Sequence, residues 1–156
     1  MKTLKEIGLH HVGFVVPNLE KTIERFEKLY GLPAGQPYEF RPGRVWSYGQ
    51  EVDNYCLRIS MVSMDDGSLI ELIQPVSGEG VHRDFIAAGN NGMHHLAFSV
   101  DDYDYWHDYF KATDANFVFE SETEDELNGY RRCFYAEDEI AGMIYEIKEN
   151  PYFRNK

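Results

Sequence analysis

Internal similarity between two segments constrains the fold of this chain more than any other feature of its sequence. Residues 9–19 read LHHVGFVVPNL, and residues 93–103 read MHHLAFSVDDY. Each segment holds two adjacent histidines, an apolar residue, a small residue, a phenylalanine and, two positions later, a valine. His11 of the first segment and His95 of the second lie 84 positions apart. The similarity predicts that the chain is built from two related units.

Both copies continue with the pattern of a strand, a turn and a helix. Apolar residues at helical spacing predict a helix over 19–30 after the first copy and a helix over 103–111 after the second. Strand-like segments follow in each unit. They cover 45–48, 56–64 and 69–74 in the first unit, and we take 117–120, 132–136 and 143–148 as their respective counterparts.

The first unit carries about nine extra residues, which we place in the turn-rich stretch 32–53. A unit of roughly 70 residues would be marginally stable alone, so we expect the two units to pack together. The prediction is a single α+β domain over 1–156, made of a βαβββ module over 8–75, a linker helix over 76–91 and a second βαβββ module over 92–149. The acidic segment 120–126 is expected to be a solvated loop, and His82 and His107 are expected at the surface.

The charge balance argues against several classes of partner. Fifteen lysines and arginines against 27 aspartates and glutamates give a net charge of −12, which repels nucleic acid and anionic membranes. No apolar run approaches the ~18 residues of a membrane span, and we recognise no signal peptide. The two cysteines, Cys56 and Cys133, are too few for a disulfide framework, so we expect free thiols and a cytoplasmic protein.

Histidine and glutamate recur at matching positions of the two units. Because side chains alternate between the faces of a strand, one histidine of each adjacent pair can face a central cleft. The two glutamates lie in the middle of apolar strand-like segments, where an uncompensated charge is costly. The matching residues are His10, His11 and Glu71 in the first unit and His94, His95 and Glu146 in the second.

Two imidazoles and two carboxylates form a mixed nitrogen and oxygen set that suits a borderline divalent cation such as Zn, Ni, Co, Fe or Mn. Four protein ligands would leave one or two positions for water or substrate, which is typical of a catalytic rather than a structural site. The alternative is that these histidines are hydrogen-bonded core residues and that the glutamates face solvent.

The chain resembles the vicinal oxygen chelate superfamily, which includes glyoxalase I, methylmalonyl-CoA epimerase, extradiol dioxygenases and bleomycin resistance proteins. Four motifs in order carry the resemblance over 8–149: LHHVGFVVPNL at 9–19, IELIQP at 70–75, GMHHLAFSVDD at 92–102 and GMIYEI at 142–147. The resemblance implies paired βαβββ modules that form an incomplete β-barrel around one divalent metal ion, expected to be Co, Ni, Zn or Mn. It implies His11, Glu71, His95 and Glu146 as the metal ligands.

By the same resemblance, the chain is expected to be a metal-dependent isomerase or lyase that removes a proton next to a carbonyl, with Glu146 as base. Its expected substrate is an acyl thioester or a thiol adduct, and a homodimer is expected. The linker and the second histidine pair favour an enzyme similar to methylmalonyl-CoA epimerase. Arg58 stands where that family has a second acid, so a glyoxalase I-like enzyme and a non-catalytic binding protein remain alternatives. The roles of Arg41 and Arg44 stay open.

Overall fold

A computed structural model describes residues 1–126 and 128–151 of the chain. The helices are α1 (Leu4–Ile7), α2 (Leu19–Tyr30), α3 (Val81–Ala87) and α4 (Tyr103–Lys111). The strands are β1 (His11–Val15), β2 (Tyr38–Phe40), β3 (Arg44–Ser47), β4 (Gln50–Val52), β5 (Cys56–Ser63), β6 (Leu69–Ser77), β7 (Gly92–Val100), β8 (Asn116–Asp125), β9 (Gly129–Asp138) and β10 (Met143–Glu149). No described helix is long and apolar enough to cross a membrane.

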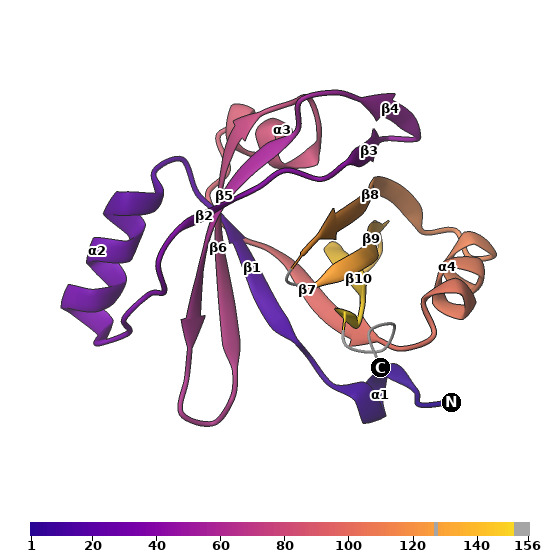
Figure 1. Ribbon diagram of the computed structural model, residues 1–156, viewed down its shortest axis with the longest axis horizontal. Coiled ribbons are helices and arrows are strands. Elements are labelled where there is room, and N and C mark those ends of the chain that lie inside the picture. Colours follow the sequence, from indigo (N-terminus) through magenta and orange to yellow (C-terminus); the bar gives the residue numbers. More distant parts are fainter. Residues whose placement is uncertain (127, 152–156) are drawn as a thin grey trace.

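All ten strands belong to one sheet, in the order β2-β5-β6-β1-β7-β10-β9-β8-β3-β4. The sheet curls into an open half-barrel, with α2 and α4 on opposite sides of the molecule (Figure 1). Strands β1, β6, β5 and β2 repeat the arrangement of β7, β10, β9 and β8, and the two sets join through the antiparallel pair β1–β7. The incomplete barrel of two βαβββ units is therefore confirmed, and the units pair within one chain.

The predicted helices are confirmed because their ends are capped and their apolar faces are covered. The Asn18 side chain accepts a hydrogen bond from the Lys21 amide at the start of α2, and Gly31 ends this helix in the left-handed conformation that glycine favours. Fully buried Leu19 anchors α2 on the first unit. In α4, Trp106 packs into the buried cluster that contains Phe134 of the second unit.

The predicted correspondence between 45–48 of the first unit and 117–120 of the second is wrong. The counterpart of β8 is β2, which lies beside β5 as β8 lies beside β9. Strand β3 instead crosses to the second unit and pairs antiparallel with β8, from Arg44 opposite Glu122 to Ser47 opposite Phe119. The extra residues of the first unit thus form the β3–β4 hairpin, which covers an edge strand that would otherwise be open.

The expected solvated loop over 120–126 is also wrong, because β8 continues to Asp125. The acidic residues of this segment alternate with small polar residues. Ser121 and Thr123 are buried on one face of the strand, whereas Glu122 on the other face is partly exposed. The segment therefore has the period of two that is typical of a half-buried strand.

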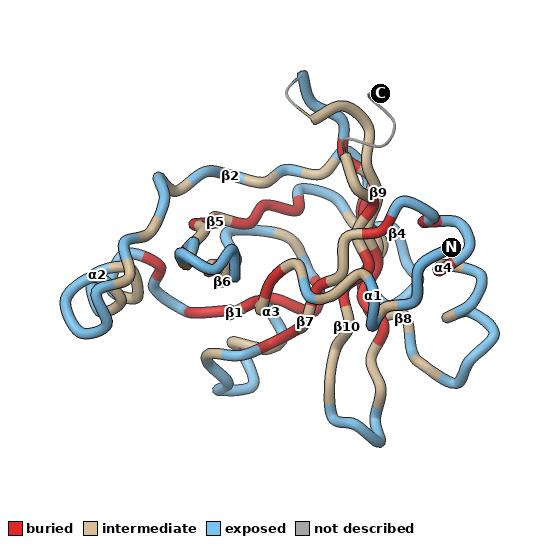
Figure 2. The backbone as a smooth tube through the Cα atoms, turned by 90° about the horizontal axis from the view of Figure 1, so that it is seen from below, coloured by how far each residue is buried: buried red, intermediate tan, exposed pale blue. Residues whose placement is uncertain are grey.

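Buried residues are concentrated in the strands of the curled sheet (Figure 2). One buried cluster fills part of the concave face and combines Val15 and Ile73 of the first unit with Phe119 and Tyr135 of the second. Helix α3 adds Val81 to the same cluster. The two units and the connecting helix therefore share one core.

Candidate metal centre

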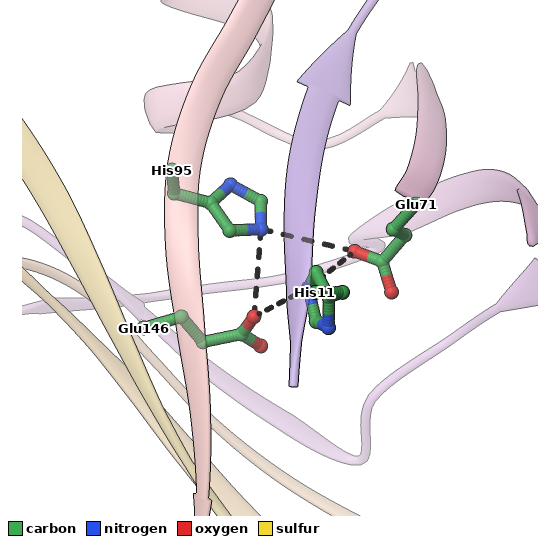
Figure 3. Close-up of side chains that lie close together, drawn as sticks. All are labelled: His11, Glu71, His95 and Glu146. Atoms are coloured by element: carbon green, nitrogen blue, oxygen red, sulfur yellow. Dashed lines mark ion pairs between the residues drawn. The ribbon is translucent and has the colours of Figure 1, made fainter. Parts of the chain in front are cut away.

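Four neighbouring strands at the middle of the sheet each contribute one potential ligand. His11 begins β1, Glu71 lies in β6, His95 in β7 and Glu146 in β10. The register places Gly13 opposite both Glu71 and His95, and Ala97 opposite both His11 and Glu146. The side chains converge from the two units toward a common point on the concave face (Figure 3).

The distances between these side chains match those of ligand atoms around one ion. His11 Nε2 lies 3.1 Å from Glu146 Oε2 and 3.5 Å from Glu71 Oε1. His95 Nε2 lies 3.4 Å and 3.8 Å from the same two oxygens, and the four ligand atoms lie within 4.8 Å of one another. Ligand bonds of about 2.1 Å would separate neighbouring ligand atoms by about 3 Å and opposite ones by about 4.2 Å.

Several of these atoms are buried without a hydrogen-bond partner among the described residues. They are His11 Nε2, His95 Nε2 and Glu146 Oε2. Leaving one such atom unsatisfied typically costs about 1–3 kcal/mol. A divalent ion would satisfy all three at once and would balance the two carboxylates, so the residues fit a metal. Their assignment as ligands remains a prediction.

The position of the His95 ring depends on a glycine. A Cβ atom at Gly13 would lie 2.1 Å from His95 Cε1 and 2.2 Å from its Nε2, closer than any real contact. The imidazole therefore occupies the space that a side chain at position 13 would fill. This close approach accounts for the small residue in the first histidine motif.

The preceding histidine of each pair supports the candidate ligand. His10 Nδ1 lies 2.8 Å from His11 Nδ1, and His94 Nδ1 lies 2.8 Å from His95 Nδ1. When Nε2 binds a metal, Nδ1 carries the proton and donates it to such a partner. His10 and His94 thus hydrogen-bond to the candidate ligands and leave both Nε2 atoms of these ligands facing the centre.

The expectation that His82 is exposed is wrong. His82 is fully buried, with Nδ1 2.7 Å from the hydroxyl of Tyr55 and Nε2 3.0 Å from the hydroxyl of Tyr135. The Tyr135 ring lies against the His95 ring, with 4.8 Å between centroids. This network connects α3 to the candidate centre. Its sequence signal is the apolar face of α3 that His82 shares with Val81 and Phe85. His107 is half-buried and hydrogen-bonds to Glu120.

The four groups form an ionic cluster. Burial alone would lower the pKa of His11, but the charges of Glu71 and Glu146 raise it to about 10. Burial would raise the pKa of Glu146, but contacts with His11 and His95 hold it well below its usual range. Burial would raise the pKa of Glu71, but other contacts, chiefly the charge of His11, lower it. Carboxylates that stay ionised when buried are ready to bind a cation.

The family model described as the Glyoxalase/Bleomycin resistance protein/Dioxygenase superfamily matches residues 10–134. The chain belongs to this superfamily. The membership confirms the resemblance to vicinal oxygen chelate proteins that the four motifs indicate. No curated protein matches the chain significantly.

Several solved structures share the fold of this superfamily member. Methylmalonyl-CoA epimerase from Mycobacterium tuberculosis is 20% identical with a TM-score of 0.65, over 91% of this chain and 87% of that one. A hypothetical protein from Bacillus halodurans is 18% identical with a TM-score of 0.65, over 91% and 93% of the two chains. A Streptomyces coelicolor methylmalonyl-CoA epimerase variant in complex with 2-nitronate-propionyl-CoA is 18% identical with a TM-score of 0.64, over 91% and 96%.

The three arginines left open by the sequence lie in surface ion pairs. Arg58 is paired with Glu20 and lies opposite Gln74, whereas Met61 on the other face of β5 lies opposite Glu71. Arg41 pairs with Glu39 and Arg44 with Glu51, and all four of these side chains are exposed. Strand β5 therefore presents no acid or base to the concave face next to Glu71.

Proposed function

We propose that the protein is a metal-dependent isomerase or lyase that removes a proton next to a carbonyl group, similar to methylmalonyl-CoA epimerase. The buried set of His11, Glu71, His95 and Glu146, with its unsatisfied ligand atoms, is the observation that carries this proposal. Superfamily membership and the likeness to epimerase structures support it. We further propose a single Co, Ni, Zn or Mn ion and a homodimer.

Each residue of the cluster would have a role in proton removal and in stabilising the enolate. A divalent ion held by the four side chains would act as a Lewis acid toward the negative charge that develops on the carbonyl oxygen. Glu146 would take the proton from the neighbouring carbon, leaving an enolate. Return of a proton to the opposite face of that carbon gives an epimer, and return to the adjacent carbon gives an isomer. Tyr135 and Gly13 would fix the orientation of His95 during these steps.

An acyl thioester is the substrate class that we favour. The related structures include an epimerase in complex with 2-nitronate-propionyl-CoA and another in complex with methylmalonyl-CoA. A glyoxalase I-like reaction on a thiol adduct is the second candidate. Two observations favour it, namely the second carboxylate of Glu71 in the cluster and the presence of Met61 rather than an acid on the concave face of β5. A binding protein without chemistry would not require four converging ligand-type side chains.

Metal content measured on protein purified without an affinity tag tests the centre first. Elemental analysis should find about one divalent ion per chain in the wild type and in Glu146→Gln, and little in His95→Ala, because loss of an imidazole removes a ligand without replacement. Absence of metal in the wild type, even after supply of Co, Ni, Zn and Mn, would contradict the proposed enzyme.

Proton exchange then tests the chemistry. In D₂O, the metal-loaded protein should exchange the proton on carbon 2 of methylmalonyl-CoA, as followed by NMR. The Glu146→Gln variant should be slower by about 10²–10⁴-fold, the usual contribution of a general base. If the protein converts the methylglyoxal–glutathione adduct but exchanges no deuterium into methylmalonyl-CoA, the result would favour the glyoxalase I-like reaction.

A further inference from the structure

Two cations lie on the concave face beyond the candidate ligands. Lys148 follows Glu146 by two positions on β10, so both side chains point to the same face of the sheet. Lys148 lies opposite Cys133 of β9, and Arg131 follows on the same face of β9. Both cationic side chains are partly buried, and Arg131 is already paired with Asp125, 2.7 Å away. The sheet thus carries positive groups inside a strongly acidic protein.

The apolar cluster of the concave face packs against β10 next to the candidate ligands. Ile144, which precedes Glu146 by two positions, packs on the buried cluster to which α3 contributes Val81, Phe85 and Ile86. Lys148 lies in the opposite direction along β10, next to Cys133, which also packs against that cluster. Lys148 is thus the charged residue at the edge of the apolar cluster on the Glu146 side of β10.

Lys148 has no ion-pair partner within 4 Å in the described part of the chain. Its charge nevertheless acts on groups at the centre. The pKa of His10 falls to about 4, first because of burial and then because of the positive charge of Lys148. Burial and Glu146 raise the pKa of the Cys133 thiol, and Lys148 opposes this rise. Because Lys148 and Glu146 lie two positions apart on one face of β10, the ammonium group lies on the same face as the candidate ligands.

The net charge of the metal-loaded centre determines whether Lys148 has a counter-ion. Two carboxylates and one divalent ion form a neutral set with two neutral imidazoles, so a loaded centre leaves the charge of Lys148 without a counter-ion. A partly buried ammonium without a partner is unfavourable unless an anion approaches it. The substrate is the group that can supply one.

A hydrogen-bond donor lies on the same face of the sheet in the first unit. Tyr38 of β2 is opposite Ile59 of β5, which places it on the same face as Met61 and Glu71. Tyr38 is 48% exposed, and its partial burial and the charge of Glu71 raise its pKa to about 12, while Arg131 acts in the other direction. Tyr38 thus remains a protonated hydroxyl on this face.

We propose that Lys148, flanked by Arg131 and Tyr38, binds an anionic group of the substrate, either a carboxylate or a phosphate. Two positions along a strand span about 6.6 Å, so this group would lie roughly that far from the oxygens that reach the metal. The inference rests on the proposed function, since it assigns the substrate of the same centre an additional negative charge.

Calorimetric titration of the metal-loaded full chain with matched 2-oxo acids tests this subsite. 2-Oxopentanoate and 2-oxoglutarate offer the metal the same adjacent oxygens, but only 2-oxoglutarate carries a distant carboxylate. We expect 2-oxoglutarate to bind at least tenfold more tightly to the wild type. The Lys148→Gln variant should reduce this ratio to within twofold, and Lys148→Arg should retain most of it. The Lys21→Gln variant, with the same charge change on exposed α2, should leave the ratio unchanged.

The outcomes separate the subsite from the metal chemistry. Equal binding of both acids by the wild type, or a ratio that Lys148→Gln does not lower, overturns the subsite while leaving the proposed function intact. Failure of the wild type to load metal or to bind either acid overturns both. If 2-oxoglutarate binds tightly, 2-oxopentanoate does not bind, and Lys148→Gln abolishes the binding of 2-oxoglutarate, the subsite is supported. The same result contradicts binding of the two adjacent oxygens at the metal, because both acids carry them. Phosphonopyruvate, titrated in parallel, shows whether the subsite prefers a phosphate-like group to a carboxylate.

Discussion

Gly13 determines where the imidazole of His95 can lie. A methyl group at this position would overlap the ring, with the added carbon 2.1 Å from Cε1. The Gly13→Ala variant should therefore displace the imidazole and weaken metal binding by at least about tenfold, as displaced or unsupported ligands do. Competition with a chromophoric chelator measures this affinity.

Gly43→Ala is the matched control for that variant. A Cβ at Gly43 would lie 3.6 Å from the Glu122 carbonyl oxygen, an ordinary contact, so the fold and the metal affinity should be retained. Equal affinity in Gly13→Ala and wild type, with circular dichroism showing an intact fold, would contradict the close-approach argument.

Repetition made the candidate ligands visible in the sequence. His11 and His95 share one motif, and Glu71 and Glu146 share another, so four residues that lie far apart in the chain were predicted to converge. The structure brings them together, although their metal binding itself remains a prediction. His82 has no repeated counterpart, and its hydrogen-bond partners lie 27 and 53 positions away, so the apolar face of α3 could indicate its burial but no local pattern could reveal its partners.

Whole elements were predicted better than their partners. Hydrophobic spacing identified α2 and α4 to the residue, but it placed β3 in the wrong half of the sheet. Strand patterns specify which face is buried, whereas the neighbour of an edge strand depends on the path of the connecting loops. The strand β8 was partly missed because its acidic composition concealed the alternation that buries Ser121 and Thr123.

The crossing hairpin should stabilise the shared core. Val45 of β3 is 1% exposed and belongs to the cluster that combines both units. The Val45→Ala variant removes two methyl-sized groups and should lower the free energy of unfolding by about 1–3 kcal/mol in urea titrations. Gln50→Ala, at an exposed position of the same hairpin, should change it by less than about 0.5 kcal/mol. Similar values for both variants would contradict a structural role for the hairpin.

Helix α3 should make stability depend on pH through His82. Burial holds the pKa of His82 well below 6.5, whereas the unfolded chain titrates near that value. Below pH 6.5 the unfolded state therefore binds more protons than the folded state, and the free energy of unfolding falls as the pH falls, by up to about 1.4 kcal/mol per unit.

The His82→Gln variant tests this dependence. It should reduce the slope of unfolding free energy between pH 6.5 and 5 by up to about 1.4 kcal/mol per unit. Val81→Ala, a buried and non-titrating change in the same helix, should lower stability without changing the slope. A slope identical in wild type and His82→Gln would show that His82 is protonated in the folded state.

For the whole molecule, the repeat predicted two units packed into one domain, because each unit has one sheet face that only the other unit can cover. The half-barrel was implied by the family resemblance. The division into modules over 8–75 and 92–149 with a linker over 76–91 remains a prediction, as does the homodimer. The join through β1 and β7 has a consequence for function. His11 and Glu71 come from one unit and His95 and Glu146 from the other, so a bound ion would link the two halves directly.

Metal binding should therefore stabilise the chain as one cooperative unit. An ion at 100 times its Kd adds about 2.7 kcal/mol to the free energy of unfolding, which corresponds to a rise in Tm of about 5–11 °C for a chain of this size. Calorimetry with and without a chelator should show one transition that moves by this amount, and hydrogen exchange should slow in β6 and β10 alike. His95→Ala should show no shift. Protection confined to one unit would mean that the ion, where it binds, is not held by residues of both halves.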